Sequence, residues 1–413
     1  VNRISRIYYG GKYFFYPIQI GDIFRKTGII TIIHAGVTFT WAMVKQMFSR
    51  KPIVNMKEAY VAQFGSKLYE MFFCHYTEKV WGLPCEKLSS DWVSQRSKGL
   101  SIWSIIREAL LSDNKNKYSS LIDEFMYPRY GYMRIPERMA EEVESFGNDI
   151  KINTKVTRVT YNGANDLEVR YMQGDKEQVI KGTEVVSTIP MTVLAKILTP
   201  ECDEKVTKAA NELDFRNLIT VNVMVKKKQV SPDTWLYVQD SDVLFGRLHE
   251  PKNWSPDMVP DDDHTSLVLE CFCSLNDHIW AMSDDDIVKR CVRDLVDKLK
   301  FITDDEFEGA SVVRTYHAYP VYDLQYLKKT EIVKSFLSKF KGLHIVGRGG
   351  THRYNNSDHS VEMGLLLGQK ILGYNVDFMK VNTEEDYQEI ISEDDEKRQG
   401  YIPIKTLKKM ANN

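Results

Sequence analysis

The sequence predicts an α/β fold that combines a buried parallel sheet, a mixed sheet and a helical region. Three observations predict it. Leu343 to Val346 is a short apolar run bounded by glycine, which is typical of a strand buried on both faces of a parallel sheet. Residues 216–273 contain several runs of alternating apolar residues, whereas residues 21–127 have mostly helical patterns.

Glycine turns divide the first half of the chain into a predicted hairpin, a helical region and a small meander. Gly10 and Gly11 predict a hairpin over residues 1–20, between two runs rich in tyrosine and phenylalanine. An amphipathic helix is predicted over Glu137 to Phe146, ended by Gly147. A small meander follows, with predicted strands at Lys151 to Val159, Leu167 to Met172, Gln178 to Lys181 and Val185 to Ile189.

The second half of the sequence predicts a mixed sheet that covers the functional site. Its expected strands are Leu218 to Val225, Trp235 to Val238, Val243 to Leu248, Ser266 to Phe272 and Ser311 to His317. Asp284 to Lys300 has apolar residues on one face, which predicts a helix. The residues after Gly373 are polar and predict a solvated or docking extension.

The loop Gly347 to Ser360 joins the buried strand to a helix and is predicted to face a ligand. Asp358 is expected to cap that helix, because a side-chain oxygen accepts from the free N–H groups of the first turn. The positive end of the helix dipole favours an anion there. Val361 to Leu372 carries apolar residues all round, which predicts a buried helix.

Two arginines are candidate anion contacts. Arg348 directly follows the predicted parallel strand, where a guanidinium can fork onto phosphate oxygens; a salt bridge to a nearby carboxylate is the alternative. Arg247 lies on a strand whose alternate residues are apolar, and an inward arginine needs a partner such as a diphosphate. The alternative is that Arg247 faces water.

Tyr319, Tyr322 and Tyr354 fall on predicted loops at strand ends. Tyrosines in such places often serve packing, but their hydroxyls can also reach phosphates or a sugar ring. No Ser-His-Asp order, carboxylate pair or phosphate-binding P-loop stands out in the sequence, so the protein's own side chains do not indicate the reaction.

Composition excludes several function classes. The 413 residues carry 55 basic and 57 acidic side chains, a net charge of −2, so the sequence indicates neither a nucleic-acid nor a membrane partner. Six cysteines are few for this length, and a reduced cytoplasmic protein is expected. Cys271 and Cys273 have no zinc-type spacing around them, so we expect core packing and no metal site.

The longest uncharged apolar stretch runs from Gly28 to Val44. Its 17 residues fall short of the ~20 that a membrane span needs, and Thr31, His34 and Thr38 interrupt it. A buried helix is the favoured interpretation. Contact of one helix face with a membrane surface is the alternative.

The loop and five further motifs together resemble the FAD-dependent amine oxidase and protoporphyrinogen oxidase-like superfamily, and are most similar to its UDP-galactopyranose mutase-like branch. The resemblance extends from about residue 3 to about residue 373. The further motifs are Tyr13 to Pro17, His75 to Pro84, Ser90 to Trp92 with Gln95 and Arg96, Ser187 to Pro190, and Ala318 to Asp323.

The resemblance implies an FAD/NAD(P)-binding Rossmann-like parallel sheet, with FAD as cofactor and the reactive atoms on the flavin. It implies cofactor contacts at Gly347, Arg348, Gly349, Asn356, Asp358, His359 and Ser360. The implied substrate contacts are Arg247, Tyr319, Tyr322 and Tyr354, for a small molecule such as a UDP-sugar. Two chemistries remain open: rearrangement of a sugar after attack by reduced flavin, and hydride transfer to flavin in an oxidase.

The family opens with a strand, G-x-G-x-x-G and a helix that cradle the FAD pyrophosphate, and no G-x-G-x-x-G occurs in the sequence. We therefore expect the N-terminal βαβ unit to be missing and FAD to be held weakly. A non-catalytic remnant that serves as a binding or scaffold module is the alternative function, and a homo-oligomer is compatible with either.

The expected organisation follows the motifs in order. It comprises a substrate-side hairpin (1–20), a helical substrate-side region (21–150), an FAD-domain meander (151–200), a mixed-sheet substrate domain (201–330), an FAD-binding strand, loop and helix (331–373) and a polar tail (374–413).

Overall fold

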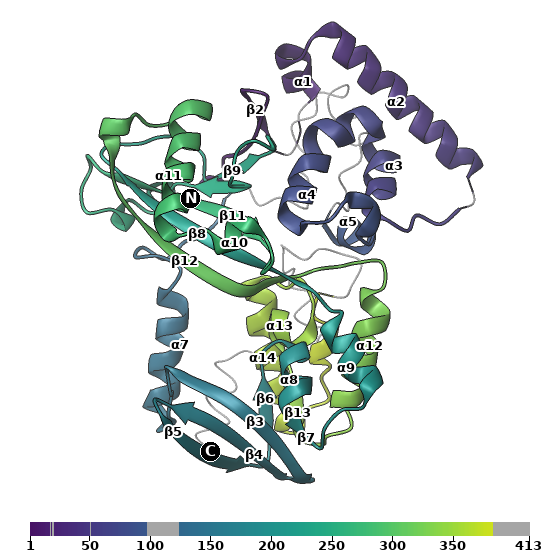
Figure 1. Ribbon diagram of the computed structural model, residues 1–413, viewed down its shortest axis with the longest axis vertical. Helices are drawn as coiled ribbons and strands as arrows, with labels where there is room; N and C mark the ends of the chain where they lie inside the picture. The colour runs from purple at the N-terminus through teal and green to yellow at the C-terminus, as the bar shows by residue number, and fades with distance from the viewer. Residues whose placement is uncertain (17, 19, 50, 97–123, 383–413) are drawn as a thin grey trace.

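The computed structural model describes residues 1–16, 18, 20–49, 51–96 and 124–382. Figure 1 shows a large sheet with its helices at the upper left and a helical region at the upper right. Two smaller sheets and the remaining helices lie below. The predicted helical pattern at residues 97–123 and the tail from residue 383 lie outside the described residues.

The large sheet has seven strands and is mixed, as predicted. In spatial order they are β12 (Phe307–Pro320), β8 (Phe215–Val225), β11 (Thr265–Cys273), β10 (Arg247–His249), β9 (Trp235–Val238), β1 (Ser5–Tyr9) and β2 (Lys12–Phe15). Only β1 and β9 pair in parallel. The predicted hairpin is present, and its turn residues Gly10 and Gly11 have φ angles of 56° and 75°, which glycine adopts without strain.

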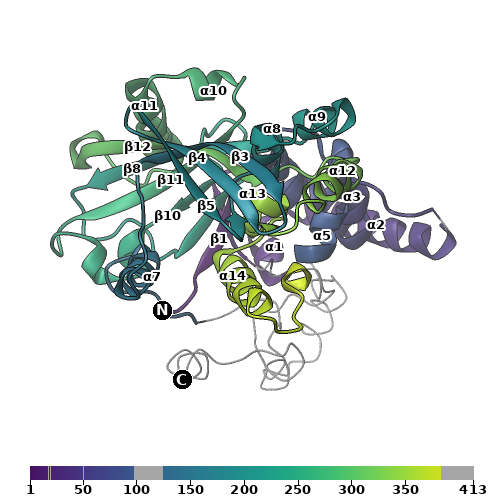
Figure 2. The ribbon, with the colours of Figure 1, turned by 90° about the horizontal axis from the view of Figure 1, so that it is seen from below.

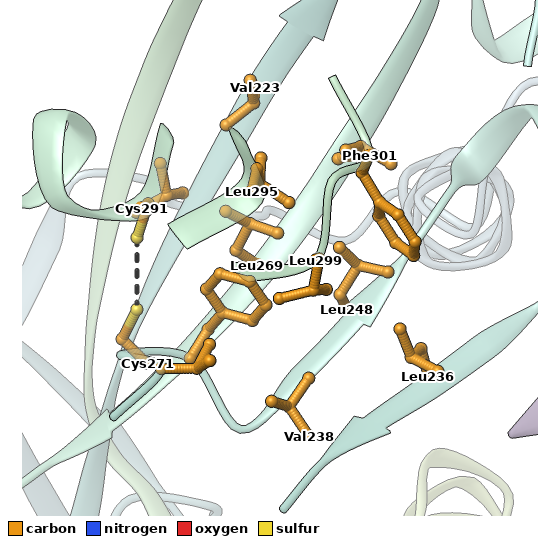
Figure 3. Close-up of a cluster of buried hydrophobic side chains, with 14 of the residues drawn as sticks. Val223, Leu236, Val238, Leu248, Leu269, Cys271, Cys291, Leu295, Leu299 and Phe301 are labelled. Atoms are coloured by element: carbon orange, nitrogen blue, oxygen red, sulfur yellow. Dashed lines mark hydrogen bonds between the residues drawn. The ribbon is translucent and has the colours of Figure 1, made fainter. Parts of the chain in front are cut away.

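One face of this sheet packs against α10 (His278–Ala281) and α11 (Asp284–Arg293). Figure 3 shows Cys291 of α11 beside Cys271 of β11 in this core. The helix predicted over Asp284 to Lys300 is an α-helix only as far as Arg293. A π-helical turn, Asp294–Lys298, follows it. Cys271, Cys273 and Cys291 are fully buried, and the Cys271 and Cys291 sulfurs lie 3.8 Å apart. Core packing is therefore confirmed for Cys271 and Cys273.

Strand β10 is shorter than the predicted strand Val243 to Leu248. The carbonyl oxygens of Val243 and Phe245 accept hydrogen bonds from the Lys79 ammonium at 3.0 and 3.3 Å, so they are turned away from strand pairing. Burial lowers the pKa of Lys79 to about 8. Strand β12 is longer than predicted and has an irregular register between Thr315 and Tyr319.

The parallel pairing predicted for Leu343 to Val346 is confirmed. Strand β13 (Leu343–Ile345) pairs in parallel with β6 (Val185–Ser187), from Leu343 opposite Val185. A separate sheet has the order β5 (Lys176–Gly182), β4 (Asp166–Gln173), β3 (Thr154–Gly163) and β7 (Leu198–Thr199). Helices α8 (Met191–Ile197), α9 (Glu204–Asn211) and α12 (Tyr326–Leu337) share one core with these sheets.

After β13 the chain forms α13 (Gly347–Thr351), α14 (Ser357–Ile371) and a 3-10 turn, Phe378–Lys380. The predicted loop thus begins with a short helix. The prediction that α14 is buried all round is wrong, because only one face packs, through Met363 and Leu367 against Val346 and Phe378. Val361 and Ile371 on its other face are 37% and 42% exposed.

The helical region contains α1 (Ile20–Lys26), α2 (Ile29–Phe48), α3 (Met56–Tyr69), a π-helix (Glu70–Cys74), α4 (His75–Trp81), a 3-10 turn (Cys85–Lys87) and α5 (Asp91–Arg96). Helix α7 (Arg134–Ser145) begins before the predicted Glu137 and has no buried residue. None of the described helices combines the length and apolarity of a membrane span.

The prediction that the stretch Gly28 to Val44 forms a buried helix is wrong. Helix α2 contains the stretch, but only Ala35 and Ala42 are buried in it. Figure 1 shows the physical reason: α2 lies at the outer edge of the molecule, where α3 covers one narrow face.

Candidate functional site

Two cavities share the lining residues Tyr237, Arg247, Tyr319 and Tyr354. The larger has a volume of about 420 Å³, and its further polar lining includes Arg3, Ser5, Glu270, Arg348 and Asn356. The smaller has a volume of about 130 Å³, and its further lining is mostly aromatic, including Tyr60, Phe64, Phe72, Tyr76 and Trp81. A polar and an aromatic cavity side by side suit a ligand that is charged at one end and flat or apolar at the other.

The Arg247 side chain is only 14% exposed and is paired within the protein, so the interpretation that it faces water is wrong. It stands opposite Glu270 in the antiparallel pair of β10 and β11, and its Nη2 atom forms an ion pair with that carboxylate. Nη2 also donates to the Tyr319 hydroxyl at 2.6 Å. The partner within the protein is thus a carboxylate rather than the expected diphosphate. Its Nε atom is buried without a hydrogen-bond partner among the described residues.

Glu270 is a residue that the sequence analysis missed. It lies in the apolar strand β11, so the same reasoning that drew attention to Arg247 applies to it: a charge on a buried strand needs a partner. The sequence does not reveal that two strands place these charges opposite each other. Arg3 and Tyr237 were also missed, because nothing local distinguishes them from surface and core residues.

Tyr319 ends β12 on the wall between the two cavities. Its ring stacks on that of Tyr354, with the ring centroids 5.6 Å apart and the ring planes at 16°. Burial raises the pKa of Tyr319, and burial also raises the pKa of Tyr76 well above its ordinary value. Both phenols are therefore protonated near neutral pH and can donate hydrogen bonds.

Arg348 lies in α13 beside two tyrosine rings that stack on each other. Its guanidinium carbon is 4.9 Å from the ring centroids of both Tyr319 and Tyr354. Nε donates to the Asn355 carbonyl at 2.7 Å and Nη1 to the Ala318 carbonyl at 3.0 Å. Nη2 has no hydrogen-bond partner among the described residues, and no described carboxylate pairs with the guanidinium. The predicted salt-bridge alternative is therefore wrong, and the arginine keeps its charge for a ligand of the larger cavity.

Tyr322 lies outside both cavities, and the structure favours packing for this residue. It is 2% exposed, and its ring stacks on that of Tyr326 with the centroids 4.1 Å apart and the ring planes at 6°. Its hydroxyl accepts a hydrogen bond from the Tyr354 backbone N–H at 2.7 Å. Burial raises the pKa of Tyr322 to about 12. Tyr322 therefore supports the position of Tyr354 from behind.

The prediction that Asp358 caps α14 is wrong. The N-cap is Asn356, whose side chain accepts from the backbone N–H of His359, while His359 Nδ1 accepts from the Asn356 N–H at 3.1 Å. This reciprocal capping box satisfies two free donors and starts the helix two residues earlier. Asp358 therefore falls in the first turn with its side chain 66% exposed, away from the cavity lining.

Asn356 lines the larger cavity, whereas His359 and Ser360 stabilise the helix start behind it. The Ser360 hydroxyl donates to the Asn356 carbonyl at 3.1 Å. The N-terminal end of α14 therefore borders the cavity through its cap. Its positive end favours a negative group on that side.

The glycines of α13 serve two different purposes. Gly347 has a φ of 75°, which side chains rarely adopt. A Cβ on Gly349 would come within 3.3 Å of the Thr188 carbonyl, and one on Gly350 within 2.9 Å of the Ser187 carbonyl. These two glycines let α13 lie directly on the end of β6.

The end of the parallel pair fits an extended anionic cofactor such as FAD. The carboxyl ends of β6 and β13 lie at the same edge, which is where open α/β sheets bind ligands. There the Ser187 hydroxyl is buried without a partner among the described residues. A free hydroxyl, the guanidinium of Arg348 and the start of α14 are a donor set suited to phosphate or to a flavin carbonyl edge.

One group in the described chain has ligand atoms spaced as in a metal site. Atoms of Cys74, Glu78 and Cys85 lie within 4.8 Å of one another. Burial raises the pKa of the Cys85 thiol to about 12 and also raises that of Cys74. Cys85 is fully buried in the core that it shares with Phe72 and Trp81, which favours packing for this cysteine.

A protein-family comparison identifies the class of protein. The family described as flavin containing amine oxidoreductase matches residues 80–359, which is more than half of the chain. The match includes strands β8 to β12 of the large sheet, with Arg247 and Tyr319, and the whole of α13.

Solved structures share the fold. Reduced UDP-galactopyranose mutase matches with a TM-score of 0.77 at 18% identity, covering 94% of this chain and 83% of that one. Putrescine oxidase bound to putrescine matches with a TM-score of 0.58 at 15% identity, and the match covers 90% of this chain and 82% of that one. An oxidoreductase from Methanosarcina mazei matches with a TM-score of 0.55 at 12% identity, and the match covers 85% of this chain and 76% of that one. At these identities the likeness concerns the fold, which agrees with the predicted Rossmann-like class.

Proposed function

The chain belongs to the family of flavin-containing amine oxidoreductases, and we propose that within this family it is an enzyme acting on a nucleotide sugar or a related substrate with a diphosphate. FAD is the cofactor, as the sequence predicts. The observation that carries the substrate proposal is Arg348, whose Nη2 atom is unpaired at the wall of the larger cavity.

Arg348 and Arg3 supply the positive charge for the diphosphate. Arg348 is pre-organised by Tyr319, Tyr354 and two carbonyl oxygens, so little side-chain entropy is lost when an anion binds. Arg3 lines the same cavity and is held by a hydrogen bond from its Nε to Ser5 at 3.1 Å. Charge-assisted hydrogen bonds from the two guanidinium groups to phosphate oxygens then fix the direction of the substrate.

Arg247 has a positioning role. Because Glu270 neutralises its charge, it adds little net attraction for an anion, but it holds the Tyr319 hydroxyl at the boundary of the two cavities. The protonated hydroxyls of Tyr319 and Tyr76 are left to bond sugar oxygens. The aromatic side chains of the smaller cavity exclude water from that end of the site.

The residues expected at the cofactor are Gly347, Arg348, Gly349 and Asn356, with His359 and Ser360 fixing the helix start. When bound, a flavin supplies either acceptance of a hydride or a nucleophilic ring nitrogen, and the protein supplies position and charge. Asp358 is left out of this set, since its side chain points to solvent.

The experiment uses flavin-loaded protein in two redox states. Chemically reduced protein is incubated with UDP-galactopyranose and the mixture is analysed for the furanose isomer, while oxidised protein is assayed for hydrogen peroxide with primary amines such as putrescine. Isomerisation, or binding of the UDP-sugar without peroxide from amines, supports the proposal. Peroxide from an amine together with no affinity for UDP would replace it with an amine oxidase.

A further inference from the structure

Helix α2 presents an apolar stripe that the described chain does not cover. The stripe consists of residues spaced three or four apart, each 41–82% exposed: Ile30, Ile33, Val37, Trp41, Val44 and Phe48. A helix of 20 residues is ~30 Å long, so the stripe extends over most of that length. Contiguous apolar surface of this extent marks an interaction site.

The opposite face of α2 is held firmly. Ala35 and Ala42 are buried, and Gly65 of α3 approaches so closely that a Cβ there would lie 2.7 Å from the Phe39 backbone nitrogen. The Lys67 N–H also donates to the Thr38 hydroxyl at 3.4 Å. The stripe therefore faces away from α3, which holds the helix in place. Figure 1 shows α2 at the outer edge of the molecule.

The charged residues of the segment that contains α2 have one sign. Residues 23–57 contain no Asp or Glu and six basic residues, Arg25, Lys26, Lys45, Arg50, Lys51 and Lys57. The side chains of Arg25, Lys45 and Lys51 are exposed and have no described carboxylate within 4.0 Å. Cations thus flank both ends of the stripe.

We propose that α2 docks on the surface of an anionic lipid bilayer, with the stripe at the headgroup boundary and the flanking cations on lipid phosphates. An apolar face with a central tryptophan and flanking Lys and Arg is the pattern of an interfacial helix. A second copy of the chain fits less well, because packing stripe on stripe would bring these cations together without acidic partners. The helix lies on the membrane and does not span it.

This docking is independent of the substrate, and it replaces the expectation that the protein has no membrane partner. Helix α3, on which α2 rests, also lines the smaller cavity through Tyr60 and Phe64. Helix α3 therefore connects the docking helix α2 to the candidate site.

Sedimentation with vesicles tests the proposal. The purified protein is mixed with phosphatidylcholine vesicles, either pure or with an equal share of phosphatidylglycerol, and the bound fraction is measured at increasing salt. We expect binding to the anionic vesicles that weakens with salt. The double variant V37E/W41E should lower partitioning by about tenfold or more, and each of R25Q, K45Q and K51Q by about fivefold.

The matched control is M139E/V143E, which makes the same kind of change on the exposed helix α7 and should leave binding unchanged. Circular dichroism establishes that each variant is folded. The proposal is overturned if the unsubstituted protein stays in the supernatant with both vesicle types. It is also overturned if V37E/W41E leaves vesicle binding intact while light scattering shows that it dissociates a dimer.

Discussion

The Nη2 atom of Arg247 lies 2.6 Å from the hydroxyl oxygen of Tyr319, which ties β10 in the interior of the seven-stranded sheet to the last residues of β12. Tyr319 in turn stacks on Tyr354, which lies two residues before the Asn356 cap of α14. Two segments from the mixed sheet and one from the parallel region thus form one wall. We expect a change at any of these residues to affect both substrate and cofactor binding.

Arg348→Ala should weaken the binding of UDP or the retention of flavin by roughly 2–5 kcal/mol, if Arg348 holds a desolvated anionic partner. R348K should recover part of this loss, because it restores the charge but not the planar fork that lies beside the two tyrosine rings. Calorimetry with UDP and the flavin absorbance per protein measure the two effects. Arg314→Ala, which removes a partly exposed ion pair with Asp284, is the control. Unchanged values for both quantities in R348A would remove Arg348 from the site.

Glu270→Gln should separate stability from binding. Breaking a buried ion pair by removing one partner costs about 3–5 kcal/mol, so the midpoint of denaturant unfolding should fall. The charge of Arg247 is then free to attract an anion, and UDP should bind more tightly to the variant than to the original protein. A variant that unfolds at the same midpoint, or that binds UDP more weakly, contradicts the arrangement.

Gly350→Ala should disturb the cofactor edge, because a Cβ there meets the Ser187 carbonyl at 2.9 Å and α13 must move away from β6. We expect lower flavin retention and a lower melting temperature. Gly364→Ala is the matched control, since a Cβ in that part of α14 has open space, and it should stabilise by ~0.5–1 kcal/mol. Equal flavin retention in the two variants would show that the close approach at Gly350 is unimportant.

Lowering the pH should destabilise the protein through His249. Its ring packs nearly parallel to the rings of Trp235 and Trp254, with centroid distances of 5.0 and 4.6 Å. Burial, with the nearby charge of Arg247, lowers its pKa to about 3 from an ordinary value of 6.5. Below pH 6.5 the unfolded chain therefore binds more protons than the folded one. Its stabilising contribution is complete above pH 6.5 and is lost as the pH falls towards 3, by ~1.4 kcal/mol per unit.

The variant H249F keeps an aromatic ring in that stack and should flatten the dependence of the unfolding free energy on pH. Some dependence remains, because burial also lowers the pKa of His352, to about 4. Denaturant unfolding at a series of pH values measures both slopes. Parallel curves for the two proteins would show that His249 titrates normally when folded.

The sequence predicted the parallel pair, the mixed sheet and an inward position for Arg247, because each depends on local pattern. The partner of Arg247 was not predictable, because Glu270 is distant in sequence and is brought opposite it only by strand register. The cap of α14 was placed at Asp358 instead of Asn356, since several residues there are capable of capping and local geometry decides among them. For α2 the apolar pattern was read correctly as a helix, but hydrophobicity alone does not show whether a face is covered.

The central claim is that Arg348 and its neighbours bind a diphosphate, and titration of flavin-loaded protein with UDP in a calorimeter tests it most directly. We predict saturable binding at low salt that weakens as salt screens the exposed part of the charge pairs, and that is lost or strongly reduced in R348A. Absence of UDP binding at low salt, in protein shown by absorbance to hold flavin, would contradict the claim.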